Sequence, residues 1–107
     1  MAFTIKQHDN WPLLSLALTD QNGPIDLSTA SSVKLILKQA LPPTTVTGAM
    51  AISVPASAGI VTYTWAGTNT DVPGSYDGEV EITWAAGKVE TVPNDGYFSV
   101  IIQSDLG

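Results

Sequence analysis

The residue types that carry most enzyme chemistry are few in this chain, and they do not form a catalytic pattern. His8 is the only histidine, it stands beside Asp9, and the chain contains no cysteine. Nucleophilic catalysis by a serine requires a histidine held between a hydroxyl and a carboxylate. No Gly-x-Ser-x-Gly motif is present to supply the serine. The sequence therefore predicts no catalytic residue and a non-enzymatic protein.

Carboxylates occur close together in two places. Glu79 and Glu81 are separated by one residue in an alternating segment, so in a strand they would share one face about 7 Å apart. This places them side by side, whereas glycosidases need carboxylates on both sides of a substrate. Asp71 and Asp77 bracket a turn-rich loop whose spacing is not that of a calcium-binding loop. We therefore predict no metal ion and no cofactor.

Three tryptophans raise the question of sugar binding, because exposed aromatic rings stack on sugars in carbohydrate-binding modules. Trp65 and Trp84 continue the apolar pattern of their segments and are predicted to be core residues. Trp11 precedes Pro12 and is the one candidate sugar contact. An adhesion module that binds carbohydrate is therefore one alternative function.

Alternation of polar and apolar residues with period 2 dominates the chain and predicts strands. Turn residues such as the run from Asp20 to Pro24 separate these segments. The clear alternating segments are 3–5, 14–18, 33–38, 61–65, 76–84, 89–92 and 97–102. Seven or eight short strands separated by Gly/Pro turns predict an all-β sandwich. The length suits a single domain over residues 1–107.

Charge is scarce and mostly negative. Four lysines and no arginine stand against ten acids, which gives a formal net charge of −6. Such a chain lacks the cationic surface of a nucleic-acid binder or of a protein that binds anionic membranes. No apolar run approaches the roughly 20 residues of a membrane span, and the start does not resemble a signal peptide. We expect production in the cytoplasm, with no nucleic-acid or membrane partner.

The scarcity of charge is most marked from Gln39 to Thr70, where no residue is charged. Two interpretations remain open: a loop with a modest edge strand, or a neutral surface covered by another subunit, since interface cores are depleted in charge. The candidate partner-binding residues are Ile36, Pro42, Pro43, Val46, Met50, Ile52, Val54 and Ile101. We expect removal of residues 42–55 to abolish assembly and to leave the fold intact.

Several turn motifs, taken in order, resemble a known family. They are Asp9-Asn10-Trp11-Pro12, the segment 20–27 running into 33–35, the segment 59–65, Asp71-Val72-Pro73-Gly74-Ser75-Tyr76 and the segment 87–97. Together these stretches span nearly the whole chain and resemble the N-terminal domain of baseplate upper proteins from siphophage tails.

This resemblance implies an immunoglobulin-like antiparallel β-sandwich that fixes other virion proteins to the tail or baseplate. The expected partners are other virion structural proteins, in a homo-oligomer or symmetric array, and the expected location is the virion, assembled in the host cytoplasm. Members of that family continue into a linker and a region that holds the receptor-binding protein, whereas the sequence ends at Gly107. A neck, collar or head-decoration subunit is therefore an alternative to the tail or baseplate adaptor.

Overall fold

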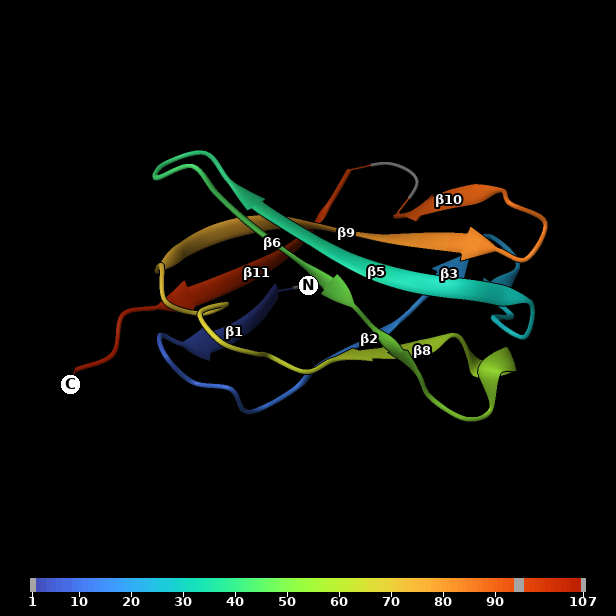
Figure 1. Ribbon diagram of the computed structural model, residues 1–107, viewed down its shortest axis with the longest axis horizontal. Coiled ribbons are helices and arrows are strands. Elements are labelled where there is room, and N and C mark those ends of the chain that lie inside the picture. Colours follow the sequence, from blue (N-terminus) through green and yellow to red (C-terminus); the bar gives the residue numbers. More distant parts are fainter. Residues whose placement is uncertain (1, 94–95, 107) are drawn as a thin grey trace.

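Two layers of strands make up the computed structural model (Figure 1), which describes residues 2–93 and 96–106. The elements in chain order are β1 (Ala2–Lys6), β2 (Leu14–Ala17), β3 (Thr19–Asp20), β4 (Gly23–Pro24), β5 (Ala30–Gln39), β6 (Thr44–Ala49), β7 (Ala51–Ile52), the short 3-10 helix η1 (Ala56–Ala58), β8 (Ile60–Tyr63), β9 (Gly74–Trp84), β10 (Val89–Val92) and β11 (Phe98–Gln103). The predicted all-β sandwich is confirmed.

The larger layer, called here the large sheet, has the strand order β1-β11-β9-β5-β6, and β10 also pairs with β9. The smaller layer, the small sheet, has the order β2-β8-β7, and β3 and β4 form a separate two-residue hairpin. The chain passes from the large sheet to the small sheet between β1 and β2 and again between β6 and β7. Within the described part of the chain, no helix is long and apolar enough to cross a membrane.

The core lies between the two sheets and follows from the alternation. Leu35 and Leu37 of β5 and Val80 and Ile82 of β9 are fully buried, while the residues between them face outward. A strand side chain points to one face at every second position, so the apolar set of each strand is buried together. The other buried apolar residues are Ile5, Leu14, Leu18, Ile25, Leu27, Val33, Val46, Met50, Val61, Tyr63, Trp65, Tyr76, Val100 and Ile102.

The arrangement differs from the expectation in two respects. β1 pairs with β11 in parallel, so the sandwich is not wholly antiparallel. Because the chain leaves the large sheet after β1, no hairpin fixes the direction of this strand. The described residues also contain eleven strand segments instead of seven or eight, since β3, β4 and β7 are additional strands of two residues each.

β9 is paired on one side with two successive strands. Val92 of β10 pairs with Val80, and Phe98 of β11 pairs with Gly78, which leaves Glu79 between the two paired stretches. The turn from β9 to β10 is a hairpin, and Gly87 adopts a φ of 84° there. Asn94 and Asp95, which belong to the segment 87–97 of the family resemblance, lie outside the described residues.

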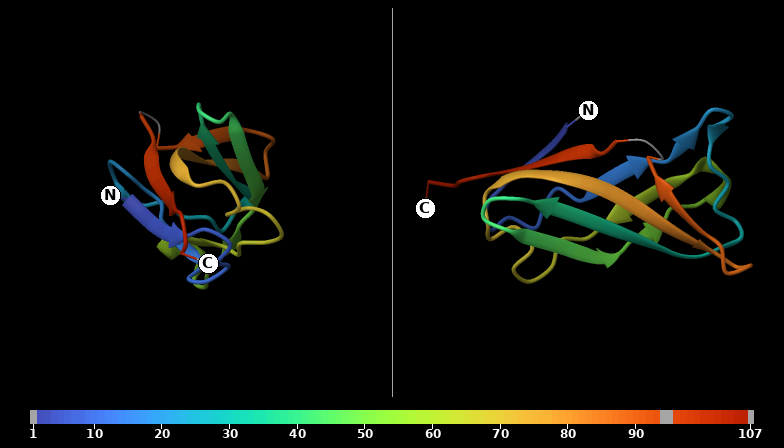
Figure 2. Two further views of the ribbon diagram at one scale, coloured as in Figure 1. Left: turned by 90° about the vertical axis from the view of Figure 1, so that its left-hand side faces the viewer. Right: turned by 90° about the horizontal axis from the view of Figure 1, so that it is seen from above.

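The two edge strands of the large sheet lie on opposite sides of the molecule, as the end-on view shows (Figure 2). β1 forms one edge and β6 the other. The chain continues from β6 almost directly into β7, which is an edge strand of the small sheet. One continuous segment, 44–52, therefore supplies an edge of both sheets.

Candidate interaction surface

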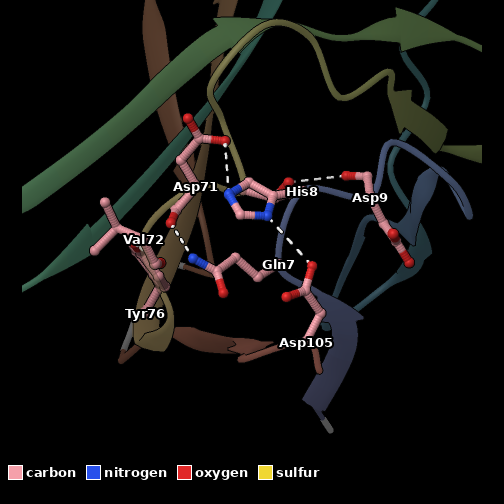
Figure 3. Close-up of polar contacts among 8 residues, drawn as sticks. Gln7, His8, Asp9, Asp71, Val72, Tyr76 and Asp105 are labelled. Atoms are coloured by element: carbon pink, nitrogen blue, oxygen red, sulfur yellow. Dashed lines mark hydrogen bonds and ion pairs between the residues drawn. The ribbon is translucent and has the colours of Figure 1, made fainter. Parts of the chain in front are cut away.

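The only histidine lies in a cluster of polar side chains just after β1 (Figure 3). His8 Nδ1 is 3.2 Å from Asp105 Oδ2, and His8 Nε2 is 3.8 Å from Asp71 Oδ1. The backbone of His8 has a φ of 69°, a left-handed conformation that few residues other than glycine adopt. Backbone contacts fix this conformation, because His8 N–H donates to the carbonyl of Thr70 at 3.2 Å.

This cluster joins three segments that are distant in the sequence. Gln7 donates through Nε2 to the carbonyl of Asp71 at 2.8 Å, and its own N–H donates to the carbonyl of Gln103 at 2.6 Å. Both ring nitrogens of His8 face carboxylates, whereas a catalytic triad needs one of them on a nucleophilic hydroxyl. The arrangement suits a clamp that ties the end of β1 to the 70–72 loop and to the residues after β11.

Three other acidic residues, Glu79, Glu81 and Asp26, lie on a strand and in a loop outside this cluster. Glu79 and Glu81 share the outer face of β9, side by side as predicted, and Glu81 lies 3.6 Å from Lys34 Nζ. Asp26 accepts the N–H of Ser28 at 3.0 Å, and the Ser28 hydroxyl and N–H lower the pKa of its carboxyl. No group of three or more metal-ligating side chains occurs among residues 2–93 and 96–106.

The three tryptophans occupy different environments. Trp65 is buried, meets the ring of Tyr63 edge to face at a centroid distance of 5.2 Å, and donates to the carbonyl of Pro12 at 3.0 Å. Trp84 is half-buried against the core and donates to Glu90. Trp11 is 71% exposed. The side chain singled out for sugar binding is therefore accessible, whereas Trp65 is buried and Trp84 is half-buried.

Within the uncharged segment, residues 44–52 form an edge of both sheets, and the side chains of β6 divide between an inner and an outer face. Val46 and Met50, predicted to contact a partner, are only 6% and 7% exposed and belong to the core. This part of the prediction is wrong, because residues 44–49 form a strand whose alternate side chains point inward. Of the remaining candidates, Pro42, Pro43 and Val54 are exposed, and Ile36, Ile52 and Ile101 are half-buried.

The expected effect of removing residues 42–55 must be corrected for the same reason. The deletion would take out all of β6 and β7 together with the buried side chains of Val46 and Met50. Loss of two buried apolar side chains costs several kcal/mol, a large part of the stability of a small domain. Such a chain would not keep its fold, and substitutions on the outer face are the suitable test.

The outward-facing backbone groups of β6 can be assigned from its pairing with β5. Met50 N–H donates to the carbonyl of Val33 at 2.8 Å, and the register continues with Gly48 opposite Leu35. In an antiparallel pair, hydrogen-bonded and non-bonded positions alternate. The N–H and C=O groups of Thr45, Thr47 and Ala49 therefore point away from β5, and these three residues are exposed. No other described strand pairs with this edge.

The side of β6 that faces the small sheet packs against the aromatic ring of Tyr63. A Cβ atom on Gly48 would stand 2.6 Å from Cε1 of Tyr63, so the ring lies directly against the glycine. The Tyr63 hydroxyl donates to Asn69 Oδ1 at 2.8 Å, which holds the ring in place. β6 is thus packed against Tyr63 of the small sheet on its inner face, and its outer edge is open.

Comparison with known proteins does not assign the chain to a family. No protein-family model matches the sequence, and no curated protein matches it significantly. A function is therefore inferred from the geometry of the described residues and from the sequence motifs.

Proposed function

We propose that the protein is a non-enzymatic structural subunit of a phage virion, a small adaptor of the tail or baseplate type that binds neighbouring virion proteins. The observation that supports this most directly is the open edge of β6, which carries no charged residue. Edge strands of monomeric proteins are usually protected by charges, prolines or bulges. Here the flanking Pro42, Pro43 and Pro55 lie outside the strand.

The strand order is also compatible with the immunoglobulin-like topology that the baseplate resemblance implies. In such folds the strands named G, F, C and C′ form one sheet, and B, E and D form the other. Both orders are reproduced when the strands are assigned as follows: β2 as B, β5 as C, β6 as C′, β7 as D, β8 as E, β9 as F and β11 as G. Fold and function are separate questions, however, and the functional proposal depends on the edge.

Binding at this edge would proceed by addition of a partner strand. The partner's backbone would pair with the outward N–H and C=O groups of Thr45, Thr47 and Ala49, which gives affinity through main-chain hydrogen bonds. Pro42, Pro43 and Val54 are exposed at the two ends of this segment and would add apolar contacts. The half-buried Ile36 and Ile52 flank it, while Ile101 lies farther along the large sheet.

Incorporation into particles tests the proposal. The triple variant Thr45→Lys, Thr47→Lys, Ala49→Lys places three positive charges along the open edge and changes no buried side chain. We expect it to fold but to stay in the supernatant when particles are sedimented, while the original protein sediments with them. The matched control is Ser15→Lys with Ala17→Lys on β2, an exposed edge of the small sheet far from β7.

Two results would count against this function. The first is sedimentation of the triple variant with particles as efficiently as the control variant. The second is absence of the original protein from purified particles. Location of the protein within particles then separates a tail or baseplate adaptor from the alternative positions in the neck, the collar or the head surface.

A carbohydrate-binding adhesion module is the second candidate, and it is favoured by the 71% exposure of Trp11. The test is a glycan array with the original protein and with Trp11→Ala. Binding that the substitution abolishes would support adhesion, because Trp65 and Trp84 are already engaged in packing. An array without signal would leave assembly as the better account.

A further inference from the structure

We propose that the partner at the β6 edge is a second copy of this chain, paired antiparallel about a two-fold axis at Thr47. This inference deepens the proposed function and rests on it, since it names the occupant of the same edge. The pairing would join the two six-stranded large sheets into one sheet of twelve strands, with β6 against β6 at its centre. Closed two-fold dimers of this kind are the most frequent form of homo-oligomer.

Complementarity of the backbone is the first reason. The outward groups belong to Thr45, Thr47 and Ala49, which are spaced symmetrically about Thr47. In the two-fold pairing, Thr47 faces Thr47 of the second copy, and Thr45 faces Ala49. Each of these is a hydrogen-bonded position, so all six outward N–H and C=O groups of each copy find a partner.

Charge is the second reason. Two copies of a chain with a net charge of −6 repel each other wherever acidic surfaces meet. β6 carries no charge, and the charged residues paired beside it on β5 are Lys34 and Lys38, whose neighbours on β9 are Glu81 and Asp77. The edge is therefore a part of the surface where two identical acidic copies can approach without repulsion.

The side chains at the ends of the segment are the third reason. Leu41, in the turn before β6, is 86% exposed, and Val54, after β7, is 95% exposed. Antiparallel pairing about Thr47 places the Leu41 end of one copy beside the Val54 end of the other. Two exposed aliphatic side chains on each copy would thus be covered, and Thr47 beside Thr47 is a favourable cross-strand pair.

Cysteine cross-linking tests the register, and it is simple to interpret because the chain has no cysteine. Hydrogen-bonded residues of antiparallel strands have Cα atoms about 5.5 Å apart, within disulfide range. We expect Thr47→Cys to form a covalent dimer on mild oxidation, whereas Ser15→Cys on β2 does not. Thr45→Cys and Ala49→Cys should cross-link when mixed but not alone, because each then lies about 13 Å from its own copy.

Sedimentation velocity over a range of concentrations tests the association itself. The original protein should show a reversible monomer–dimer equilibrium, Thr47→Lys should abolish the dimer, and Ser15→Lys should leave it unchanged. Leu41→Ser should weaken dimerisation by more than about tenfold, because the two-fold axis repeats the lost aliphatic contact at both ends of the paired segment.

An original protein that stays monomeric up to its solubility limit would overturn the self-pairing. If the lysine variants of β6 then still fail to join particles, the edge binds a different protein and the proposed function stands. If these variants join particles normally, the proposed function fails as well. A dimer that forms without the Thr47→Cys cross-link would overturn the two-fold at Thr47.

Discussion

The two edges of the large sheet, β1 and β6, are built differently. β1 carries Lys6 on its exposed face and ends in the clamp of His8 with Asp71 and Asp105. β6 carries no charge, and its open side presents the backbone of three small residues. Charge on an edge strand discourages pairing with other chains, and its absence permits pairing. The difference indicates that β1 is the better protected of the two edges and that β6 is the less protected one.

The largest effect is expected from comparing neighbouring residues of β6. Val46→Asp places a carboxylate in the core and should lower the free energy of unfolding by about 3 kcal/mol or more. Thr47→Asp, on the exposed face, should change it by less than about 1 kcal/mol. Urea denaturation of both variants provides the measurement. Equal losses would show that the outer face of β6 is not free.

An effect of about 1–3 kcal/mol is expected where β6 rests on the tyrosine ring. The Cβ atom added by Gly48→Ala would stand 2.8 Å from the Tyr63 hydroxyl oxygen, so the ring or the strand must shift. Combination with Tyr63→Leu should recover part of the loss, because the obstructing ring is then absent. Thermal unfolding of the two single variants and the double variant gives the coupling. Additive losses would contradict the contact.

A smaller, pH-dependent effect involves the same ring. Burial raises the pKa of the Tyr63 hydroxyl above its ordinary value. A raised pKa means that the folded protein favours the protonated form of the hydroxyl. The hydroxyl therefore makes its full contribution to the free energy of unfolding below about pH 10, and this contribution is lost as the pH rises above that value. The free energy of unfolding should therefore fall less steeply above about pH 10 for Tyr63→Phe than for the original protein. Parallel pH profiles would contradict this assignment.

The smallest effect is expected at the clamp beside β1. His8→Asn removes both contacts of the imidazole with carboxylates but keeps a residue type that tolerates a left-handed backbone. Because the imidazole is largely exposed, we expect a loss of less than about 1 kcal/mol. Faster amide hydrogen exchange should be confined to β1 and should not reach β6. Faster exchange at β6 would show that the two edges are coupled.

The strands were predictable from the sequence because the sandwich buries one face of each strand. Val80 and Ile82 are large and apolar, while Glu79 and Glu81 are charged, so the alternation is unmistakable. In β6 the contrast is weak, since threonine, glycine and alanine surround Val46. The sequence therefore indicated a neutral segment but could not separate its buried residues from its exposed ones.

The pairing of strands that are distant in the chain could not be predicted from the sequence, for a different reason. His8 and Asp105 are 97 residues apart, and only the parallel pairing of β1 with β11 brings them together. Turn chemistry fixes neighbouring strands such as β9 and β10, whereas it says nothing about strands from opposite ends of the chain. The tyrosine against Gly48 was likewise hidden, because the two residues lie in different sheets.

The passage of one segment from β6 directly into β7 has a mechanical consequence. A strand docked along residues 44–52 would be attached to the large sheet through β5 and to the small sheet through β8. Tension along the docked strand would then load rows of hydrogen bonds in both layers at once, in shear rather than one bond after another. An attachment of this kind resists pulling far better than one that hangs from a single layer.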